Sequence, residues 1–309
     1  MSLETARLAV DFAAASGRGP LRLELAAEEP DAVWPVLWYL VQYAERKAEW
    51  VRRPAALTFR GVKLPKGPRS RFLGEHRVAW KTVCRISGAP GKGEPPGAAQ
   101  GLCLVASDAR EPARWADQWV AAGWSEVLVR PENSIPGPKG REKFLGFYSV
   151  VLDRLLEHAR EGAPIREVWA AAALGRTRWK IPGLDLLNEL AYEPGGGVFS
   201  SEDAALSDTG DCVLRLATLP GNMWQDLAKS PVARAIIAAA WGENQPWCAQ
   251  CLYKDSCALP ASGNLRAQGT IWGRMPSSPL CSLQMSLAGV IFARLADPEN
   301  GPFLKTWAV

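Results

Sequence analysis

An alternation of helix-like and strand-like segments in the first half of the chain constrains its fold most strongly. Apolar residues recur at helical spacing over residues 3–13 and 33–48, which predicts two amphipathic helices. Short strand patterns occupy residues 21–25, 55–59, 78–86, 102–106 and 126–130, the last after a predicted helix over 111–122. Strands that alternate with helices form mostly parallel sheets, so we predict an α/β fold. The units are too few for a complete eight-fold barrel, which favours an open or partial (β/α) barrel.

The second half of the chain has a different character. A long amphipathic helix is predicted over residues 144–161, with shorter helices over 165–174 and 184–190. From Tyr192 onward the sequence becomes rich in glycine and cysteine, and five of the seven cysteines lie there. We therefore predict a partial α/β barrel over 1–190, followed by a small cysteine-rich domain over 191–309.

Charge and composition exclude several functional classes. The 36 Lys and Arg exceed the 32 Asp and Glu by only four, too small an excess for a dedicated nucleic-acid binder. The N-terminal residues do not form a secretory signal, and no uninterrupted apolar stretch approaches the ~18 residues of a membrane span. We expect a cytoplasmic protein that binds no membrane and keeps its thiols reduced. His76 and His158 are its two histidines, a poor supply for a Ser-His-Asp hydrolase.

Four cysteines in the last quarter form the strongest chemical signal. Cys248 and Cys251 make a C-x-x-C within the segment WCAQCLYKDSC, Cys257 ends that segment, and Cys281 lies in PLCSLQM. A C-x-x-C places two sulfurs on one tight turn, and two more distant sulfurs complete a coordination sphere. The spacing predicts one metal centre, either a [4Fe–4S] cluster or a structural zinc. The alternative is a group of ordinary buried cysteines, which is our expectation for Cys84 and Cys103 in the upstream strands.

The residues around these cysteines resemble the SPASM domain of radical SAM peptide-modifying maturases, most closely the type found in His-Xaa-Ser peptide systems. The match is specific in PWCAQCLYKDSC, QGTIWGRMP and the following Cys281. Weaker similarity extends upstream through LAYEPGGGVFSSEDA, EVLVRPENSIPGPKG and SLETARLAVDF with LRLELAAEEP. The resemblance implies a partial radical SAM-like barrel and a SPASM-like domain. It also implies that Cys248, Cys251, Cys257 and Cys281 ligate the outer auxiliary [4Fe–4S] cluster.

The chain departs from that family at its catalytic positions. It contains no C-x-x-x-C-x-x-C, the motif that holds the catalytic cluster in the family, and we expect the place of that loop to precede residue 1. The family's G-G-E-P motif is replaced by Ala27, Glu28, Glu29 and Pro30, so a Cβ and a carboxylate fill space that the glycines leave open for S-adenosylmethionine. Binding of S-adenosylmethionine is therefore not expected.

The two auxiliary sites of the family differ in this chain. The resemblance places the inner cluster's ligands near Ser201, at Cys212 and at about Pro260, so a single thiol remains there, whereas the outer set is complete. We also expect Trp247 and Tyr253 to shield the outer site from water, and Trp272 to pack over it.

The resemblance implies a catalytically degenerate relative that binds one cluster. Its role would be that of a scaffold, peptide-binding or electron-relay subunit whose partners are a precursor peptide, an active radical SAM maturase, or both. Two alternatives remain open from the sequence. The chain could be one part of a split radical SAM enzyme completed by another polypeptide, or a zinc-stabilised interaction protein.

Overall fold

The computed structural model describes residues 1–15, 19–27, 30–62, 65–89, 100–132, 136–175, 190–206, 213–254, 257 and 260–308. Within them the chain forms two compact units, each assembled from segments that are distant in sequence. Unit 1 comprises Met1–Ala79, Pro182–Gln245 and Leu259–Gly273, and unit 2 comprises Trp80–Ile181, Pro246–Ala258 and Arg274–Val309. The division into 1–190 and 191–309 stays a prediction.

Unit 1 joins a parallel strand pair to a small antiparallel sheet. Its helices and strands are α1 (Leu3–Ala15), β1 (Leu21–Ala26), α2 (Pro30–Trp50), β2 (Ala55–Gly61), α3 (Pro68–Glu75), β7 (Ala191–Tyr192), β8 (Gly197–Phe199), α7 (Glu202–Leu206), β9 (Arg215–Thr218), α8 (Trp224–Lys229), α9 (Pro231–Ala240), η2 (Gly242–Asn244) and α11 (Ala261–Gln268). β1 and β2 are parallel, with Leu21 opposite Ala55, whereas β7, β8 and β9 are antiparallel. Phe12 of α1 makes edge-to-face contacts with Tyr192 and Trp224, which fixes α1 against this second sheet.

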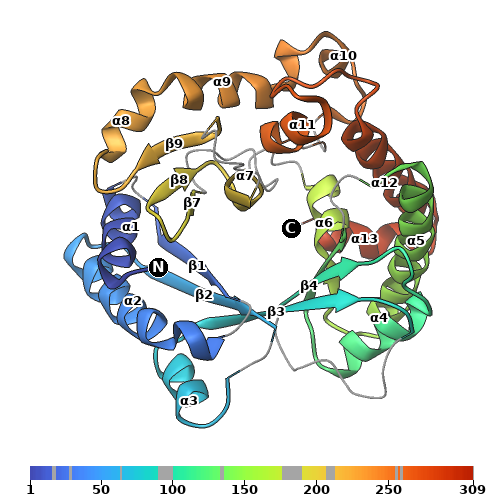
Figure 1. The fold of residues 1–309 in the computed structure, drawn as a ribbon. Coiled ribbons are helices and arrows are strands. Elements are labelled where there is room, and N and C mark those ends of the chain that lie inside the picture. Colours follow the sequence, from blue (N-terminus) through green and yellow to red (C-terminus); the bar gives the residue numbers. More distant parts are fainter. Residues whose placement is uncertain are drawn as a thin grey trace. The chain divides into compact units, whose positions relative to one another are not determined.

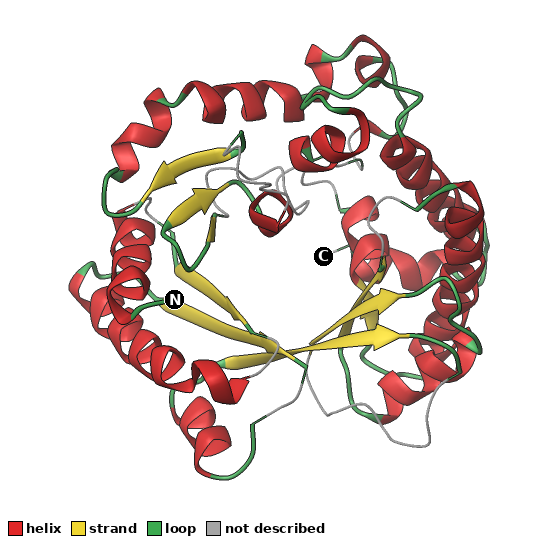
Figure 2. Ribbon diagram, viewed as in Figure 1, coloured by secondary structure: helices red, strands yellow, loops and turns green. Residues whose placement is uncertain are grey.

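Unit 2 contains a four-stranded parallel sheet and the helices that cover it (Figure 1). Its elements are β3 (Ala79–Ile86), β4 (Gln100–Val105), α4 (Pro112–Ala121), β5 (Glu126–Pro131), α5 (Pro138–Arg160), β6 (Arg166–Glu167), α6 (Val168–Leu174), α10 (Pro246–Ala249), α12 (Pro279–Ala296) and α13 (Gly301–Trp307). The strand order is β3-β4-β5-β6, with every neighbouring pair parallel. The prediction of an α/β fold with parallel strands is confirmed (Figure 2).

The long helix α5 shows why the sheet of unit 2 is covered. Its buried residues recur three or four positions apart, so they form one apolar stripe facing the sheet: Phe144, Phe147, Tyr148, Val151, Leu152, Leu155 and Leu156. Burial of each of these large side chains contributes about 1.5–3 kcal/mol before the cost of ordering the chain. Elsewhere in this core, the Trp124 ring lies so close to the backbone of Gly101 that only glycine fits there, because a Cβ would lie 1.9 Å from the ring. The same ring stacks on Trp119.

The apolar helix α12 completes the core of unit 2. Leu283, Leu287 and Ile291 recur on one of its faces and belong to the same buried cluster as the α5 stripe. In the described part of the chain, α12 is the one helix long and apolar enough to cross a membrane. This stretch was not among the helices predicted from the sequence. Its buried face supports the core of unit 2, and core helices commonly have this composition.

Candidate metal centre

The segment that carries three of the four predicted ligands is a succession of tight turns in unit 2. Cys248 lies in the one-turn helix α10, and the Cys251 N–H donates to the Cys248 carbonyl at 3.1 Å. Two more hydrogen bonds of the same spacing follow. The Lys254 N–H donates to the Cys251 carbonyl at 3.2 Å, and the Cys257 N–H donates to the Lys254 carbonyl at 3.4 Å. These turns coil the segment tightly and place its cysteines at every third or sixth residue.

The fourth predicted ligand lies at the beginning of a helix. Ser278 is the N-cap residue of α12, Pro279 occupies the first helical position, and Cys281 follows in the first turn. The N-terminus of a helix favours negative charge, so this position suits a thiolate ligand. The Cys281 sulfur is 3.9 Å from the thioether sulfur of Met285, one turn further along α12.

The four thiols act on one another electrostatically although they come from two segments. Burial, together with repulsion from the other three thiols, raises the pKa of Cys257 to about 12. Burial also raises the pKa of Cys248, and the nearby Cys281 and Cys251 thiols add smaller contributions. The pKa of Cys281 is raised by burial and, to a smaller extent, by Cys251. The fold therefore gathers four sulfur donors into one neighbourhood, where negative charge requires a compensating cation.

A single ion and a cluster place different demands on four thiol ligands. Among the described residues, no group of three or more His, Cys, Asp and Glu side chains is placed to hold one metal ion. A zinc with Zn–S bonds of about 2.3 Å would draw four sulfurs to within roughly 3.8 Å of one another. A cluster that binds each thiolate at a separate iron needs the same four donors, but at wider separations. The donor chemistry of this site fits an iron–sulfur cluster.

The surroundings of the cysteines differ from the expectation. Tyr253 stacks on Phe292 of α12, with ring centroids 5.7 Å apart, and so joins the cysteine segment to that helix. Trp247 is 67% exposed, so the prediction that it shields the site is wrong. Trp272 belongs to unit 1 and is 40% exposed. Leu252, beside Cys251, is 95% exposed, which leaves this side of the segment open to solvent.

The positions that the resemblance assigns to the inner cluster have structural roles in unit 1. The Ser201 hydroxyl accepts a hydrogen bond from the Ala204 N–H at 3.2 Å and thereby caps α7. Pro260 is the N-cap residue of α11, and its carbonyl accepts from the Asn264 N–H at 3.1 Å. Cys212 lies outside the described residues.

The segment that replaces the G-G-E-P motif follows β1. The Ala27 N–H donates to the Arg60 carbonyl at 3.0 Å, which extends the pairing of β1 with β2 by one residue. Glu28 and Glu29 lie outside the described residues, and Pro30 begins α2. Arg60 also forms ion pairs with Glu24 at 3.0 Å and with Glu202 at 2.6 Å, so charged groups of unit 1 pair with one another here.

The two histidines are held by carboxylates. His76 Nδ1 lies 2.7 Å from Glu45, and His158 Nε2 lies 2.7 Å from Asp117. Burial raises the pKa of Asp117, but the hydrogen bonds from His158 and Arg154 outweigh it and lower that pKa overall. Each contact joins an imidazole to a carboxylate and gives no support to a hydrolase site.

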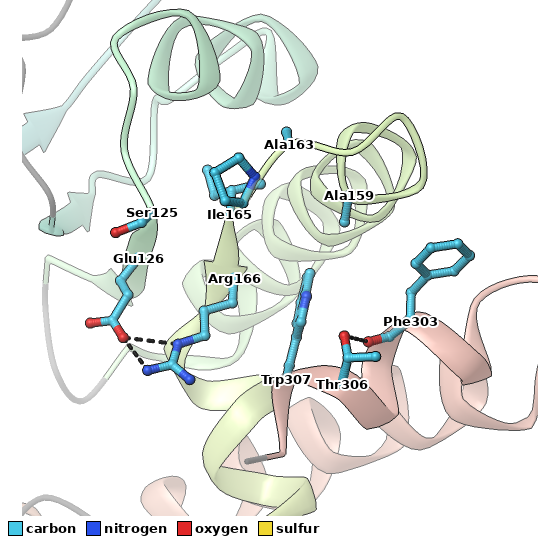
Figure 3. A pocket seen from close by; sticks show the side chains of 10 residues that line it. Ser125, Glu126, Ala159, Ala163, Ile165, Arg166, Phe303, Thr306 and Trp307 are labelled. Atoms are coloured by element: carbon cyan, nitrogen blue, oxygen red, sulfur yellow. Dashed lines mark hydrogen bonds and ion pairs between the residues drawn. The ribbon is translucent and has the colours of Figure 1, made fainter.

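Two hollows in unit 2 are lined by neither cysteine nor histidine. One, of about 380 Å³, lies where β5 and β6 begin, and there the Arg166 Nε donates to Glu126 at 2.8 Å above an apolar wall that includes Trp307 (Figure 3). The other, of about 460 Å³, lies beyond β4 and includes Arg110 and Lys143. Each lining includes a serine next to a carboxylate in the sequence, Ser125 with Glu126 and Ser107 with Asp108, but no histidine to activate the hydroxyl. The cysteine segment therefore remains the candidate site.

The fold resembles that of solved radical SAM/SPASM enzymes. Solved structures of anSMEcpe, an anaerobic sulfatase-maturating enzyme of that class, resemble this chain at 12–13% sequence identity. The structure of native anSMEcpe with bound AdoMet and the Kp18Cys peptide has a TM-score of 0.64 and covers 97% of this chain and 91% of its own. Polyhistidine-tagged anSMEcpe with bound AdoMet gives a TM-score of 0.63 over the same shares of the two chains. No family model and no curated protein matches the sequence. At this identity the likeness establishes the radical SAM-like α/β fold.

Proposed function

We propose that this chain is a catalytically degenerate relative of radical SAM/SPASM maturases that binds one auxiliary [4Fe–4S] cluster through Cys248, Cys251, Cys257 and Cys281. The observation that carries the proposal is the gathering of these four thiols, from two distant segments, on a fold shared with anSMEcpe over 97% of the chain. When bound, the cluster would tie the cysteine segment to α12 and supply a one-electron redox centre.

Four thiol donors suit either a cluster or zinc, and the family resemblance favours the cluster. Each thiol is within electrostatic reach of others, while the described residues offer no group suited to a single ion. All four cysteines are half-buried, and Cys281 lies in the first turn of α12, so the ligands are partly shielded from solvent. Zinc is the alternative occupant and would require the segment to contract around one ion.

Loss of radical chemistry is supported by residues inside the chain. Ala27 and Glu28 stand where the resemblance places two glycines, and bulk at these positions opposes the approach of S-adenosylmethionine to the backbone. Ser201 and Pro260 cap helices at two positions where the family has ligands of the inner cluster. We infer that one auxiliary site is retained and that the other functional sites have been lost.

The proposed role is that of a scaffold, peptide-binding or electron-relay subunit in ribosomal peptide modification, as in His-Xaa-Ser systems. Two of the similar anSMEcpe structures contain a bound peptide, which supports a peptide as the ligand class. The partners would be a precursor peptide and an active radical SAM maturase that supplies the missing chemistry. A retained cluster would then stabilise the complex or relay electrons to that maturase.

Metal analysis of the full chain, purified without oxygen, tests the proposal. We expect about four irons and four sulfides per chain and broad absorption near ~400 nm. The serine variant of Cys257 should lose this iron, whereas Cys84→Ser, which alters a cysteine outside the site, should keep it. Zinc as the only metal in both proteins would overturn the cluster and support the zinc-stabilised alternative.

Incubation with S-adenosylmethionine and a strong reductant separates the degenerate subunit from an enzyme. We expect no 5′-deoxyadenosine from the chain alone, because its own residues oppose cofactor binding. Cleavage by the isolated chain would overturn the proposal. Cleavage that needs both this chain and a maturase lacking its own activity would instead support the split enzyme.

A further inference from the structure

A second pair of thiols lies in the parallel sheet of unit 2, away from the cysteine segment. Cys84 of β3 and Cys103 of β4 are direct register partners. Neighbouring strands lie about 4.8 Å apart, and a disulfide needs Cα atoms roughly 4.4–6.8 Å apart. The register therefore places the Cα atoms of the two cysteines at a separation within the range that a disulfide needs.

The side chains of this pair lie on the same face of the sheet and touch. Because both cysteines occupy the same register position of parallel strands, their Cβ atoms point to the same side, and the two thiols share a hydrogen bond. This is the face that carries the buried cluster of unit 2, to which Cys103 belongs with 0% exposure. Cys84 is partly exposed, so one member of the pair is accessible to a small solute and the other is not.

The two thiols also differ in acidity, and this difference matches their difference in exposure. The hydrogen bond from Cys103 lowers the pKa of Cys84, although burial opposes the shift. Burial raises the pKa of Cys103 well above its ordinary value, and the contact with Cys84 and the nearby Glu167 raise it further. The accessible sulfur is thus the better nucleophile, and the buried sulfur keeps its proton until the first has reacted.

We propose that Cys84 and Cys103 form an oxidative modification site that closes to a disulfide when a small peroxide reaches Cys84. The Cys84 thiol first reduces the O–O bond, which yields a sulfenic acid and one water. The Cys103 sulfur then attacks the Cys84 sulfur and forms the S–S bond, and the sulfenic oxygen leaves as a second water with the Cys103 proton. Two thiols lose two electrons and two protons, and hydrogen peroxide becomes two waters. This reaction does not involve the proposed cluster ligands.

Peptide mapping of the full chain tests this site directly. Protein purified without oxygen is titrated with hydrogen peroxide, its remaining thiols are blocked with N-ethylmaleimide, and it is digested with trypsin. We expect the peptide of residues 82–85 to appear joined to that of residues 93–110, with the mass of two hydrogens lost, and dithiothreitol to separate them. Blocked thiols on both peptides at every peroxide dose, or Cys84 oxidised to sulfinic acid beside a free Cys103 thiol, would overturn the proposal.

Matched variants assign the two roles. In Cys103→Ala the sulfenic acid on Cys84 should persist and be trapped by dimedone, whereas in the wild type dimedone should label it at least tenfold less. In Cys84→Ser the buried Cys103 should remain unmodified. Equal dimedone labelling of Cys84 in the wild type and in Cys103→Ala would contradict the second step. Peptide mapping of the wild-type protein tests the disulfide by itself, even if a variant fails to fold.

Discussion

The cysteine segment of unit 2 and the ligand positions that the resemblance implies in unit 1 differ in what their residues do. In unit 2, Cys248, Cys251 and Cys257 lie on successive turns and act electrostatically on Cys281 from a separate helix. In unit 1, positions that the resemblance assigns to ligands are a serine and a proline that cap short helices. Under the proposed function, a site without ligands uses residues at or near the same positions to satisfy helix ends.

The proposed ligand Cys257 of unit 2 provides the largest test of this comparison. Cys257→Ser should reduce the iron content from about four per chain to less than one, because a hydroxyl replaces the proposed iron-binding thiolate. Ser201→Cys in unit 1 should leave the iron content unchanged, since too few thiols remain there to hold a cluster. Iron and sulfide assays of the two variants, purified side by side without oxygen, check both results. A gain of iron in Ser201→Cys would remove the contrast between the units.

A buried carboxyl group in the core of unit 2 should make the stability of the protein depend on pH. Glu167 is fully buried, and desolvation raises its pKa from 4.5 to about 7 although Tyr148 and backbone N–H groups hydrogen-bond its carboxylate. The folded state holds this proton more tightly than the unfolded state. The free energy of unfolding should therefore fall by roughly 3 kcal/mol as the pH rises from about 4.5 to about 7.

Glu167→Gln supplies the control for this effect. The variant carries no titratable group at the position, so its stability should vary less between these pH values than that of the wild type. Urea unfolding at pH 5 and pH 7, followed by tryptophan fluorescence, measures the difference. Identical pH dependence of the two proteins would show that Glu167 does not hold a proton in the folded state.

A matched pair of glycine substitutions tests how tightly unit 2 is packed. Gly101→Ala should destabilise the protein by about 1–3 kcal/mol, because the new methyl group would overlap the Trp124 ring. Gly146→Ala adds the same methyl group to α5, where nothing lies within 4 Å, and should stabilise it by about 0.5–1 kcal/mol. Denaturant midpoints of the two variants check the opposite signs.

The smallest effect concerns the Ser201 cap of α7, near which the resemblance places a ligand of the inner cluster. Ser201→Ala removes the acceptor for the Ala204 N–H and should cost about 1 kcal/mol. Ser201→Asn, which restores an acceptor at the N-cap, should recover most of that loss. Thermal unfolding of both variants provides the measurement, and equal stability of Ser201→Ala and wild type would deny the serine a capping role.

The sequence predicted the fold better than the details of the site. Strong periodicity located β1, β4 and β5 to within two residues and the end of α5 to within one, because each is buried on one face and its apolar spacing records that burial. The predicted start of α5 was six residues too late, because the helix begins at Pro138. The cysteine spacing identified the candidate donors but did not place Cys281 at the beginning of α12, which depends on packing against a core built from distant segments.

Other features of the molecule depend on how strands align with one another and on which side chains are exposed to solvent. The periodicity of the sequence does not contain this information. Cys84 and Cys103 each looked like an ordinary buried cysteine, and only the alignment of β3 with β4 makes them a pair. Trp247 suggested a shield for the site because tryptophan is usually buried, yet it lies on the one-turn helix α10 and is largely exposed to solvent. The predicted helix over 184–190 lies largely outside the described residues.

X-ray absorption at the iron edge of the anaerobically purified chain shows whether the four thiols hold a cluster. We predict iron with sulfur neighbours and additional scattering from other irons, as in a cluster held by Cys248, Cys251, Cys257 and Cys281. Protein without iron, in which a zinc-edge spectrum shows one ion surrounded by four sulfurs and no neighbouring metal, would contradict this prediction.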